Sequence, residues 1–335
     1  MFSLSSSNEI DFVLIWVDGN DPEWQNEIEK YATEQDVKFN RNNVRYREWD
    51  TLKYWFRGVE TYAPWVRKVH FVTCGHVPSW LDLNHPKLNF VKHSDYIPSE
   101  YLPTFSSHPI ELNFHRIPGL SEQFVYFNDD HFLTAPVRPE DFFRDGLPCD
   151  SAIRNIPTIS KCGHIDLNAL IILDKHFNYL QQFRKNPSKY LNWRYGLQNL
   201  RFLFLSPWPI YCGFKNTHTA FSYLKSTLAE VWEKEPDALH QTCLRKFRDE
   251  RDVNQYVFRY WQLAKGTFMP RSYSFSQQYC ISDSVLDNIL FDIRNRKHKV
   301  LCLNDNEGIA DIEPIKQKII GAFESVFPEK SSFEI

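Results

Sequence analysis

Two adjacent carboxylates, Asp129 and Asp130, follow an apolar run that begins at Phe124. Apolar residues such as Val125 and Phe127 are typical of a buried strand, whereas neighbouring carboxylates repel each other and favour water or a cation. A strand end that opens into a cleft is a natural place for the pair, and a divalent ion bridging a diphosphate would satisfy both charges. The alternative is that Asp129 caps a turn and Asp130 is a solvated loop acid.

Short apolar runs alternate with helical patterns through the first 150 residues. Strands are predicted within 10–19 and at 69–73 and 88–91, and helices within 45–62 and 110–117. This alternation predicts an α/β fold with a mostly parallel, Rossmann-like sheet, in which ligands bind beyond the C-terminal ends of the strands. Asp18 and the pair Asp129-Asp130 both lie at such ends, so we expect them to share one cleft.

Helical patterns dominate after Asp150, near 221–235 and 252–263, with weak strand signals near Ala152 and Ile171. A strand at 299–303 ends in Asn304-Asp305-Asn306, which also suits a plain turn, and a helix is predicted from about 314 to 327. We therefore expect an α/β lobe over 8–150 and a helix-rich lobe over 151–335, whose last strand and helix return to the cleft. No repeat or low-complexity linker separates the lobes, which predicts one catalytic unit.

Composition excludes several classes of protein. The 335 residues carry a net charge of -3 without a basic stripe, which argues against a nucleic-acid binder. The seven cysteines are scattered singly and are odd in number, which predicts reduced thiols instead of a zinc site or a disulfide framework. Neither a signal peptide nor a membrane-spanning stretch is visible, so we expect a cytoplasmic protein that touches a membrane at most peripherally.

Four ordered blocks of residues resemble the Stealth family of hexose-1-phosphate transferases. The first is 10–19, the second comprises 45–48, 62–66, 78–81, 107–111, 115–122 and 128–130, the third comprises 218–221 and 247–258, and the fourth comprises 302–306 and 323–328. Four blocks in order over most of the chain are more specific than any single motif. One departure is His218-Thr219-Ala220, where the family often has His-x-Pro.

The resemblance implies a glycosyltransferase-A-like sheet and transfer of a hexose 1-phosphate from a UDP-sugar to a saccharide hydroxyl. The sugar 1-phosphate would be that of an N-acetylhexosamine, from a donor such as UDP-N-acetylglucosamine, and the reaction would form a phosphodiester and release UMP. The family serves capsular and exopolysaccharide synthesis and resembles the animal lysosomal-enzyme N-acetylglucosamine-1-phosphotransferase. A lipid-linked or growing polymeric acceptor at the inner membrane fits this chemistry.

Attack on the β-phosphorus of such a donor requires neutralisation of the diphosphate. Mg²⁺ or Mn²⁺ held by Asp130 and Asp305 is the simplest means, because hard cations prefer oxygen ligands, and Asp129 would bind the ion or orient a ligand. The phosphate-binding candidates are Arg116, Arg248 and, third, Arg45. A guanidinium can bind two phosphate oxygens at once, although an ordinary salt bridge is the alternative for each.

The acceptor hydroxyl must also lose its proton, and an imidazole titrates in the right range. His218 is the first candidate for the base, and His108 and His115 are its rivals, although a lone histidine is more often structural. The candidates for contact with the nucleotide sugar are Asp18, Asn20 and Glu111, for which a helix-capping loop is the alternative at the first two.

Two other functions remain open at this point. A metal-dependent glycosyltransferase would use similar carboxylates at a strand end, but its acceptor would attack the sugar carbon and release UDP. A non-enzymatic carbohydrate-binding protein would use part of the 16% aromatic residues as stacking platforms.

Overall fold

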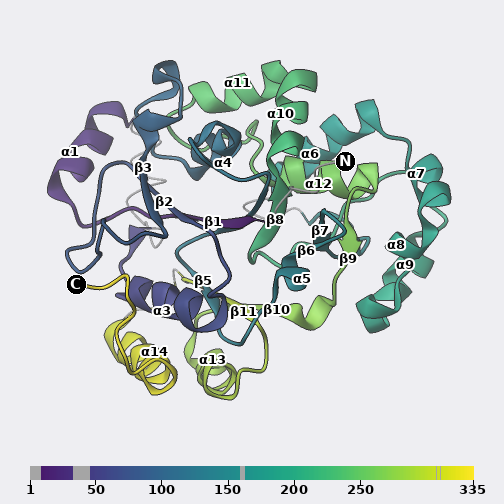
Figure 1. The fold of residues 1–335 in the computed structure, drawn as a ribbon. Helices are drawn as coiled ribbons and strands as arrows, with labels where there is room; N and C mark the ends of the chain where they lie inside the picture. Colours follow the sequence, from purple (N-terminus) through teal and green to yellow (C-terminus); the bar gives the residue numbers. More distant parts are fainter. Residues whose placement is uncertain (1–8, 33–45, 159–162, 307, 310) are drawn as a thin grey trace, which may run out of the picture.

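A five-stranded sheet forms the centre of the computed structural model, which describes residues 9–32, 46–158, 163–306, 308–309 and 311–335 (Figure 1). The strands in spatial order are β3 (Leu88–Lys92), β2 (Val69–Thr73), β1 (Ile10–Ile15), β4 (Gln123–Phe127) and β8 (Phe221–Leu224). The first four are parallel, and β8 is antiparallel to β4. The predicted α/β fold with a mostly parallel sheet is confirmed.

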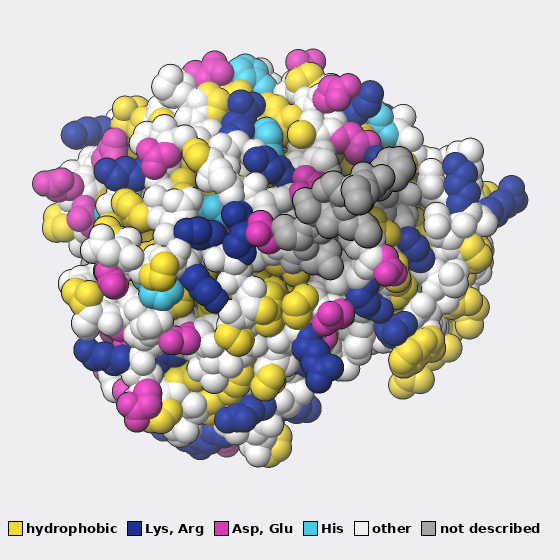
Figure 2. Space-filling model, viewed as in Figure 1, with side chains coloured by type: hydrophobic (Ala, Val, Ile, Leu, Met, Phe, Trp, Pro, Cys, Tyr) yellow, Lys and Arg dark blue, Asp and Glu magenta, His cyan; other side chains and the backbone are white. Residues whose placement is uncertain are grey.

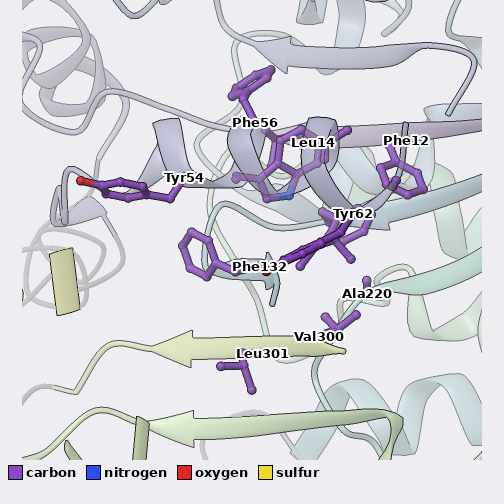
Figure 3. Close-up of a cluster of buried hydrophobic side chains, with 14 of the residues drawn as sticks. Phe12, Leu14, Tyr54, Phe56, Tyr62, Phe132, Ala220, Val300 and Leu301 are labelled. Atoms are coloured by element: carbon purple, nitrogen blue, oxygen red, sulfur yellow. The ribbon is translucent and has the colours of Figure 1, made fainter. Parts of the chain in front are cut away.

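Alternate residues of the central strands face two separate cores, as the two-residue period of a strand requires. Phe12 and Leu14 belong to one core, which includes Phe56 of α3 (Leu52–Tyr62) and Leu301 of β11 (Val300–Asn304) (Figure 3). Val13, between them, belongs to the other core. Both faces of the sheet are therefore covered, and polar groups reach a ligand only at the ends of the strands.

Helices cover each face of the sheet (Figure 1). On one side lie α4 (Ser107–Leu112), α10 (Lys225–Lys234), α11 (Pro236–Leu244) and α12 (Tyr256–Lys265), and on the other lie α3, α13 (Asp283–Asn295) and α14 (Glu313–Val326). The remaining helices are α1 (Pro22–Tyr31), α5 (Pro139–Phe142), α6 (Gly163–His176), α7 (Tyr179–Lys185), α8 (Pro187–Tyr190) and α9 (Asn199–Leu205).

The strand expected near Ile171 is wrong, because Ile171 lies within α6. Its run of isoleucine and leucine packs one helical face on the core, and short apolar runs do not distinguish a strand from a buried helix. The helix expected over 110–117 is also divided. Its residues belong to α4 and to the 3₁₀ turn Phe114–Arg116, with Asn113 between them.

Two smaller sheets extend the fold. One has the order β10 (Ser276–Cys280), β11, β5 (His131–Leu133), and the other has the order β6 (Phe143–Arg144), β7 (Leu147–Asp150), β9 (Met269–Pro270). Helix α3 lies close against β5, because a Cβ on Gly58 would stand 2.9 Å from the Leu133 carbonyl oxygen. Side chains larger than glycine would push α3 away from the segment that carries the carboxylate pair.

The second half of the chain contributes to the layers built by the first half. Strand β8 joins the central sheet, and β11 pairs with β5 directly after the carboxylate pair. Phe323 of α14 stacks on Tyr54 of α3, with ring centroids 5.3 Å apart. The expected strand at 299–303 and helix at 314–327 are confirmed as β11 and α14, whereas the lobe boundary at residue 150 stays a prediction.

None of the helices in the described ranges is long and apolar enough to cross a membrane.

Candidate active site at the strand ends

The C-terminal ends of β1 and β4 bring the first two predicted groups to the same edge of the sheet. Leu14 pairs with Phe127, so Asp18 and the pair Asp129-Asp130 both follow the ends of adjacent parallel strands. Strand β8 runs the other way, and its first residue pairs with Tyr126. The chain just before β8, which includes His218, therefore reaches this edge as well.

The Asp129 carboxyl is accessible to solvent, yet protein surrounds it closely. This burial, together with the carboxylates of Asp130 and Glu48, raises the pKa of Asp129 to about 8. A carboxyl of this pKa holds a proton near neutral pH, and a nearby positive charge would lower the pKa again. The pKa of Glu48 is also raised, because the side chain is buried and the carboxylates of Asp50 and Asp18 repel its negative charge.

Asp130 lies within a cluster of four possible metal-binding groups. Among the described residues, its carboxylate, His131, His218 and Cys302 offer ligand atoms that all lie within 4.8 Å of one another. One Asp130 oxygen accepts a hydrogen bond from the Cys302 thiol at 3.3 Å. The other, Oδ1, is buried and lies 3.4 Å from His131 Nε2, but it accepts no hydrogen bond from the described residues, which is a costly state for a carboxylate oxygen.

Two of the four groups, His131 and Cys302, are in protonation states that do not favour metal binding. Backbone N–H of Asn128 donates to His131 Nδ1 at 3.0 Å, and burial lowers the pKa of His131 to about 4. Its neutral ring then carries hydrogen on Nε2, which leaves no lone pair for an ion. Burial raises the pKa of Cys302 well above its ordinary value, so this residue is a protonated thiol.

The remaining groups fit a hard divalent cation. Asp130 Oδ1 accepts no hydrogen bond from a described residue, and the carboxylates of Asp130 and Glu48 add to the raised pKa of Asp129. Carboxylate oxygens are the ligands that Mg²⁺ and Mn²⁺ prefer, whereas a thiol and imidazoles would suit zinc. The donors available at this edge therefore favour Asp130 and Asp129 as the residues that would hold such an ion.

His218 takes an unusual backbone conformation beside this cluster. Its φ of 42° lies in the left-handed region, which a residue with a side chain rarely adopts and which often marks a functional position. Its Nδ1 lies 2.8 Å from the Tyr256 hydroxyl, and its ring centroid lies 5.6 Å from that of His131. Tyr256 therefore orients the ring at the strand ends.

A segment before α3 lines the same edge and was given no role by sequence reasoning. A Cβ on Gly19 would lie 2.1 Å from the Tyr46 carbonyl oxygen, so glycine is required for this segment to approach the end of β1. Glu48 follows and receives a hydrogen bond from Trp16 Nε1 at 3.4 Å. Arg47, between Tyr46 and Glu48, has a buried Nη1 that donates no hydrogen bond to a described residue. The signal was present in the sequence, because Arg47 and Glu48 lie within the second block.

Asp305 lies next to Arg47 and outside the cluster of four groups. Its Oδ2 accepts a hydrogen bond from Trp49 Nε1 at 3.0 Å and lies 3.5 Å from Arg47 Nε, and Asn306 donates to Oδ1 at 2.6 Å. Because both oxygens already have protein partners, Asp305 is less suited to bind a metal than Asp130. Its position favours a role in holding Arg47.

Several other predicted residues have internal partners. His108 is buried, with Nδ1 3.1 Å from Asp252 Oδ2, and burial lowers its pKa. Glu111 is also buried, and it accepts hydrogen bonds from the Tyr126 hydroxyl at 3.1 Å and from a backbone N–H at 3.3 Å. Both side chains tie α4 to its neighbours, so we leave them out of the proposed site.

His115 and Arg116 lie at the opposite end of the sheet. They neighbour Lys225, whose backbone N–H donates to the Glu122 carbonyl at the start of β4. Burial and the charges of Arg116 and Lys225 lower the pKa of His115 to about 4, and the Arg116 guanidinium lies 5.2 Å from the Trp232 ring centroid. The fold therefore separates these two from the carboxylate pair, although all lie in the second block.

The other predicted contacts have mixed outcomes. Arg248 Nη2 donates to the Ser107 hydroxyl at 3.1 Å. Asn20 is exposed, and its backbone N–H donates to Asp18 Oδ1 at 2.9 Å. The cap of α1 is Asp21, so Asp18 does not serve as the helix cap that the alternative required. Arg45 lies outside the described residues.

Models of the Stealth family match three parts of the chain: conserved region 1 over residues 8–36, region 2 over 45–150 and region 4 over 291–335. These matches and the relatives below show that the chain belongs to the Stealth family and is a phosphotransferase.

Full-length relatives carry related names. A Streptococcus pneumoniae protein named capsular polysaccharide phosphotransferase WcwK is 44% identical over 99% of both chains. The Lactiplantibacillus plantarum exopolysaccharide phosphotransferase cps2G is 40% identical over 97% of this chain and 96% of its own, and the Streptococcus oralis receptor polysaccharide phosphotransferase WefC is 42% identical over 98% and 100%. A crystal structure of LgtC aligns over 93% of this chain and 95% of its own at 11% identity, with a TM-score of 0.37, which is too low to support a functional argument.

Proposed function

We propose that this enzyme transfers a hexose 1-phosphate from a UDP-sugar to a saccharide hydroxyl and releases UMP, in the synthesis of a capsular polysaccharide or exopolysaccharide. Three relatives that match nearly the whole chain are named as polysaccharide phosphotransferases. An N-acetylhexosamine is the sugar we favour, and the acceptor is a lipid-linked repeat or a growing polymer.

The observation that carries the proposal is a pair of poorly compensated carboxyl groups at the strand ends. Among the described residues none donates a hydrogen bond to the buried Asp130 Oδ1, and the pKa of Asp129 is raised to about 8. A resident divalent cation held by these two carboxylates would supply charge neutralisation for the diphosphate of the donor. Perturbed carboxyl groups of this kind are more common at functional sites than elsewhere.

Positive charge for the phosphates comes from the same edge. Arg47 has a buried nitrogen without a partner, and Asp305 and Trp49 hold the segment in place. A guanidinium is suited to bind two phosphate oxygens at once. Arg47 therefore replaces Arg116 as the first candidate for the phosphates, while Arg248 stays a second. Asp18 and Asn20 remain the candidates for the uridine and ribose.

The acceptor oxygen attacks the β-phosphorus, the phosphorus that carries the sugar. The bond from this phosphorus to the bridging oxygen breaks, and that oxygen leaves as part of UMP. His218 takes the hydroxyl proton on Nε2, while its Nδ1–H donates to the Tyr256 oxygen. This orientation presents the basic nitrogen to the strand ends.

Phosphorus NMR of the purified enzyme tests the reaction directly. The enzyme is incubated with UDP-N-acetylglucosamine, Mg²⁺ and short oligosaccharide acceptors, with Asp130→Asn and a chelator-treated sample as controls. Appearance of a phosphodiester signal together with UMP supports the proposal. UDP together with a glycoside would contradict it and identify a glycosyltransferase. If no donor is consumed while other UDP-sugars also fail, transfer from a UDP-sugar is wrong.

A further inference from the structure

A group of large apolar side chains lies exposed on and around α9. We call it the α9 surface, and its members with their exposed fractions are Trp193 (78%), Leu197 (84%), Leu200 (49%), Leu203 (56%), Phe204 (75%) and Trp208 (55%). Helix α9 itself contains no buried residue. Figure 2 shows yellow side chains gathered at the lower right of the molecule, where Figure 1 places α9. Contiguous apolar exposure of this kind marks an interaction surface.

The backbone beneath these side chains is firmly held. Arg154 is only 2% exposed. Its guanidinium donates to the carbonyl oxygens of Leu205, Trp208 and Ile210 at 2.7, 2.9 and 2.9 Å. Phe202 packs its ring against Phe183 of α7, with centroids 5.0 Å apart. The protein therefore fixes this segment by its backbone and by one inward side chain, and presents the other apolar side chains outward.

The sequence that carries the α9 surface is rich in cations. From Lys175 through Ala229 the chain contains no Asp or Glu, although acidic residues outnumber Lys and Arg by 42 to 39 in the whole chain. Lys175 pairs with Glu235 at 2.8 Å and Lys225 lies beside the start of β4, which leaves six cations for this surface: Arg184, Lys185, Lys189, Arg194, Arg201 and Lys215. Figure 2 shows dark blue side chains at the right edge, where Figure 1 places α7.

We propose that the α9 surface docks on an anionic lipid bilayer. Tryptophans at the edge of an apolar patch, with lysines and arginines beside it, are the combination that binds at the boundary of headgroups and acyl chains. The cations of this stretch are attracted to anionic headgroups within a Debye length. A second copy of this chain is a poorer occupant, because a symmetric contact through this surface would bring the cations of both copies together.

The position of the surface in the chain links it to the site. Lys215, one of these cations, is followed three residues later by His218, and its backbone N–H donates to the Ile153 carbonyl oxygen at 2.8 Å. The docking itself is independent of the proposed transfer reaction, so either can fail without the other.

Vesicle sedimentation of the full chain tests the proposal. We expect the bound fraction to be at least about tenfold greater on phosphatidylcholine vesicles with roughly one third phosphatidylglycerol than on phosphatidylcholine alone, and to fall with salt. Two variants are compared, Trp193→Ser with Phe204→Ser, and Arg194→Glu with Arg201→Glu. Each should lower binding by at least about tenfold. The matched control is Phe291→Ser with Arg294→Glu on α13, where Phe291 is 56% exposed.

Equal binding of the wild type and both variants, or no binding of the wild type, would overturn the proposal. Sedimentation velocity without lipid provides the second measurement. A wild-type dimer that the α9 variants convert to a monomer would show that a second copy covers this surface. Circular dichroism of the variants confirms folding, which we expect to be intact because the substituted side chains are exposed or half-buried.

Discussion

Both ends of the central sheet carry carboxyl groups, but the described residues supply full hydrogen bonding at one end only. At the N-terminal end, Asp11 is fully buried and receives hydrogen bonds from Arg67 Nε at 2.8 Å, His70 Nε2 at 2.9 Å and Ser121 N at 2.8 Å. Burial alone would raise the pKa of Asp11, yet these bonds lower it below its ordinary value. At the C-terminal end, the pKa of Asp129 is raised to about 8.

This difference separates a structural charge from a functional one. A buried carboxylate with three donors is held in its ionised form by the fold and has no capacity left for a ligand. At the other end, neighbouring carboxylates raise the pKa of Asp129, and the described residues donate no hydrogen bond to Asp130 Oδ1, so an external cation can stabilise both groups. We therefore assign stability to the N-terminal end and chemistry to the C-terminal end.

The largest effect is expected from Asp130→Asn. The substitution removes the charge of the carboxylate that has the unpartnered oxygen, and turnover should fall by roughly 10³-fold or more. The free energy of unfolding should stay within about 1 kcal/mol of the wild type, because the nearest basic side chain among the described residues, His131 at 3.4 Å, is neutral with a pKa of about 4. Turnover and urea denaturation measure the two effects.

Asp305→Asn is the matched control for that variant. Its carboxylate already has Trp49 and Asn306 as donors, so we expect a smaller loss of turnover. If Asp305→Asn lowered turnover as much as Asp130→Asn, Asp305 would be a metal ligand. The assignment based on hydrogen-bond partners would then be wrong.

The next effect is expected from His218→Gln, which removes the base but keeps a polar side chain. Turnover should fall by roughly 10²-fold to 10⁴-fold, with the dissociation constant of the UDP-sugar within about twofold of the wild type. Stopped-flow kinetics and calorimetry measure these quantities. Turnover should fall less in Tyr256→Phe than in His218→Gln, because the substitution removes only the hydroxyl that orients the His218 ring. Turnover near the wild-type value in His218→Gln would remove this residue from the role.

A third prediction concerns Asp11→Asn at the N-terminal end. The variant loses the ion pair with Arg67 and weakens the bond from His70, so the free energy of unfolding should fall by about 2–3 kcal/mol. Turnover per folded molecule should not change, since this cluster lies at the other end of the strands. A large loss of turnover in a folded variant would break the comparison between the two ends.

The smallest effect is expected from His115→Gln. In the native state the pKa of His115 is about 4, below the value near 6.5 of an unfolded chain, so the native state favours the neutral ring. The stability that this provides is present above pH 6.5 and is lost as the pH falls toward 4, about 1–2 kcal/mol of it by pH 5.

Urea denaturation at pH 7 and pH 5 measures this effect. The decrease in the free energy of unfolding from pH 7 to pH 5 should be smaller in His115→Gln than in the wild type. Turnover at pH 7 should stay within about twofold of the wild type. Lost turnover with unchanged stability would instead place His115 in the site. Burial lowers the pKa of His93 to about 3 and that of His131 to about 4. These two residues should therefore still cause the free energy of unfolding to decrease between pH 7 and pH 5 in both proteins.

Sequence reasoning predicted the strands and the carboxylate pair because both depend on local pattern. The run that ends at Phe127 reads as a strand by itself, and two adjacent aspartates after it stand out without knowledge of the fold. The parallel pairing of β1 and β4 then follows from the α/β alternation, which is why Asp18 and Asp129 were expected at one edge.

Sequence reasoning did not separate residues that share a block but lie at opposite ends of the sheet. His115 and Asp129 are joined by β4 itself, so closeness in sequence places them a full strand length apart. His218 lies at the same edge of the sheet as Asp129 because β8 is antiparallel to β4. The apolar run at 221–224 does not indicate the direction of this strand. Arg47 became a candidate only when the structure showed a buried nitrogen without a partner.

The binding of Mn²⁺, observed by electron paramagnetic resonance, tests the central assignment most directly. The wild type, Asp130→Asn and Asp11→Asn are each titrated with Mn²⁺ in the presence of UDP, under conditions where all three are folded. The account predicts that the wild type and Asp11→Asn bind one ion with similar affinity and that Asp130→Asn binds it at least about tenfold more weakly. Equal affinity in all three proteins, or loss only in Asp11→Asn, would contradict it.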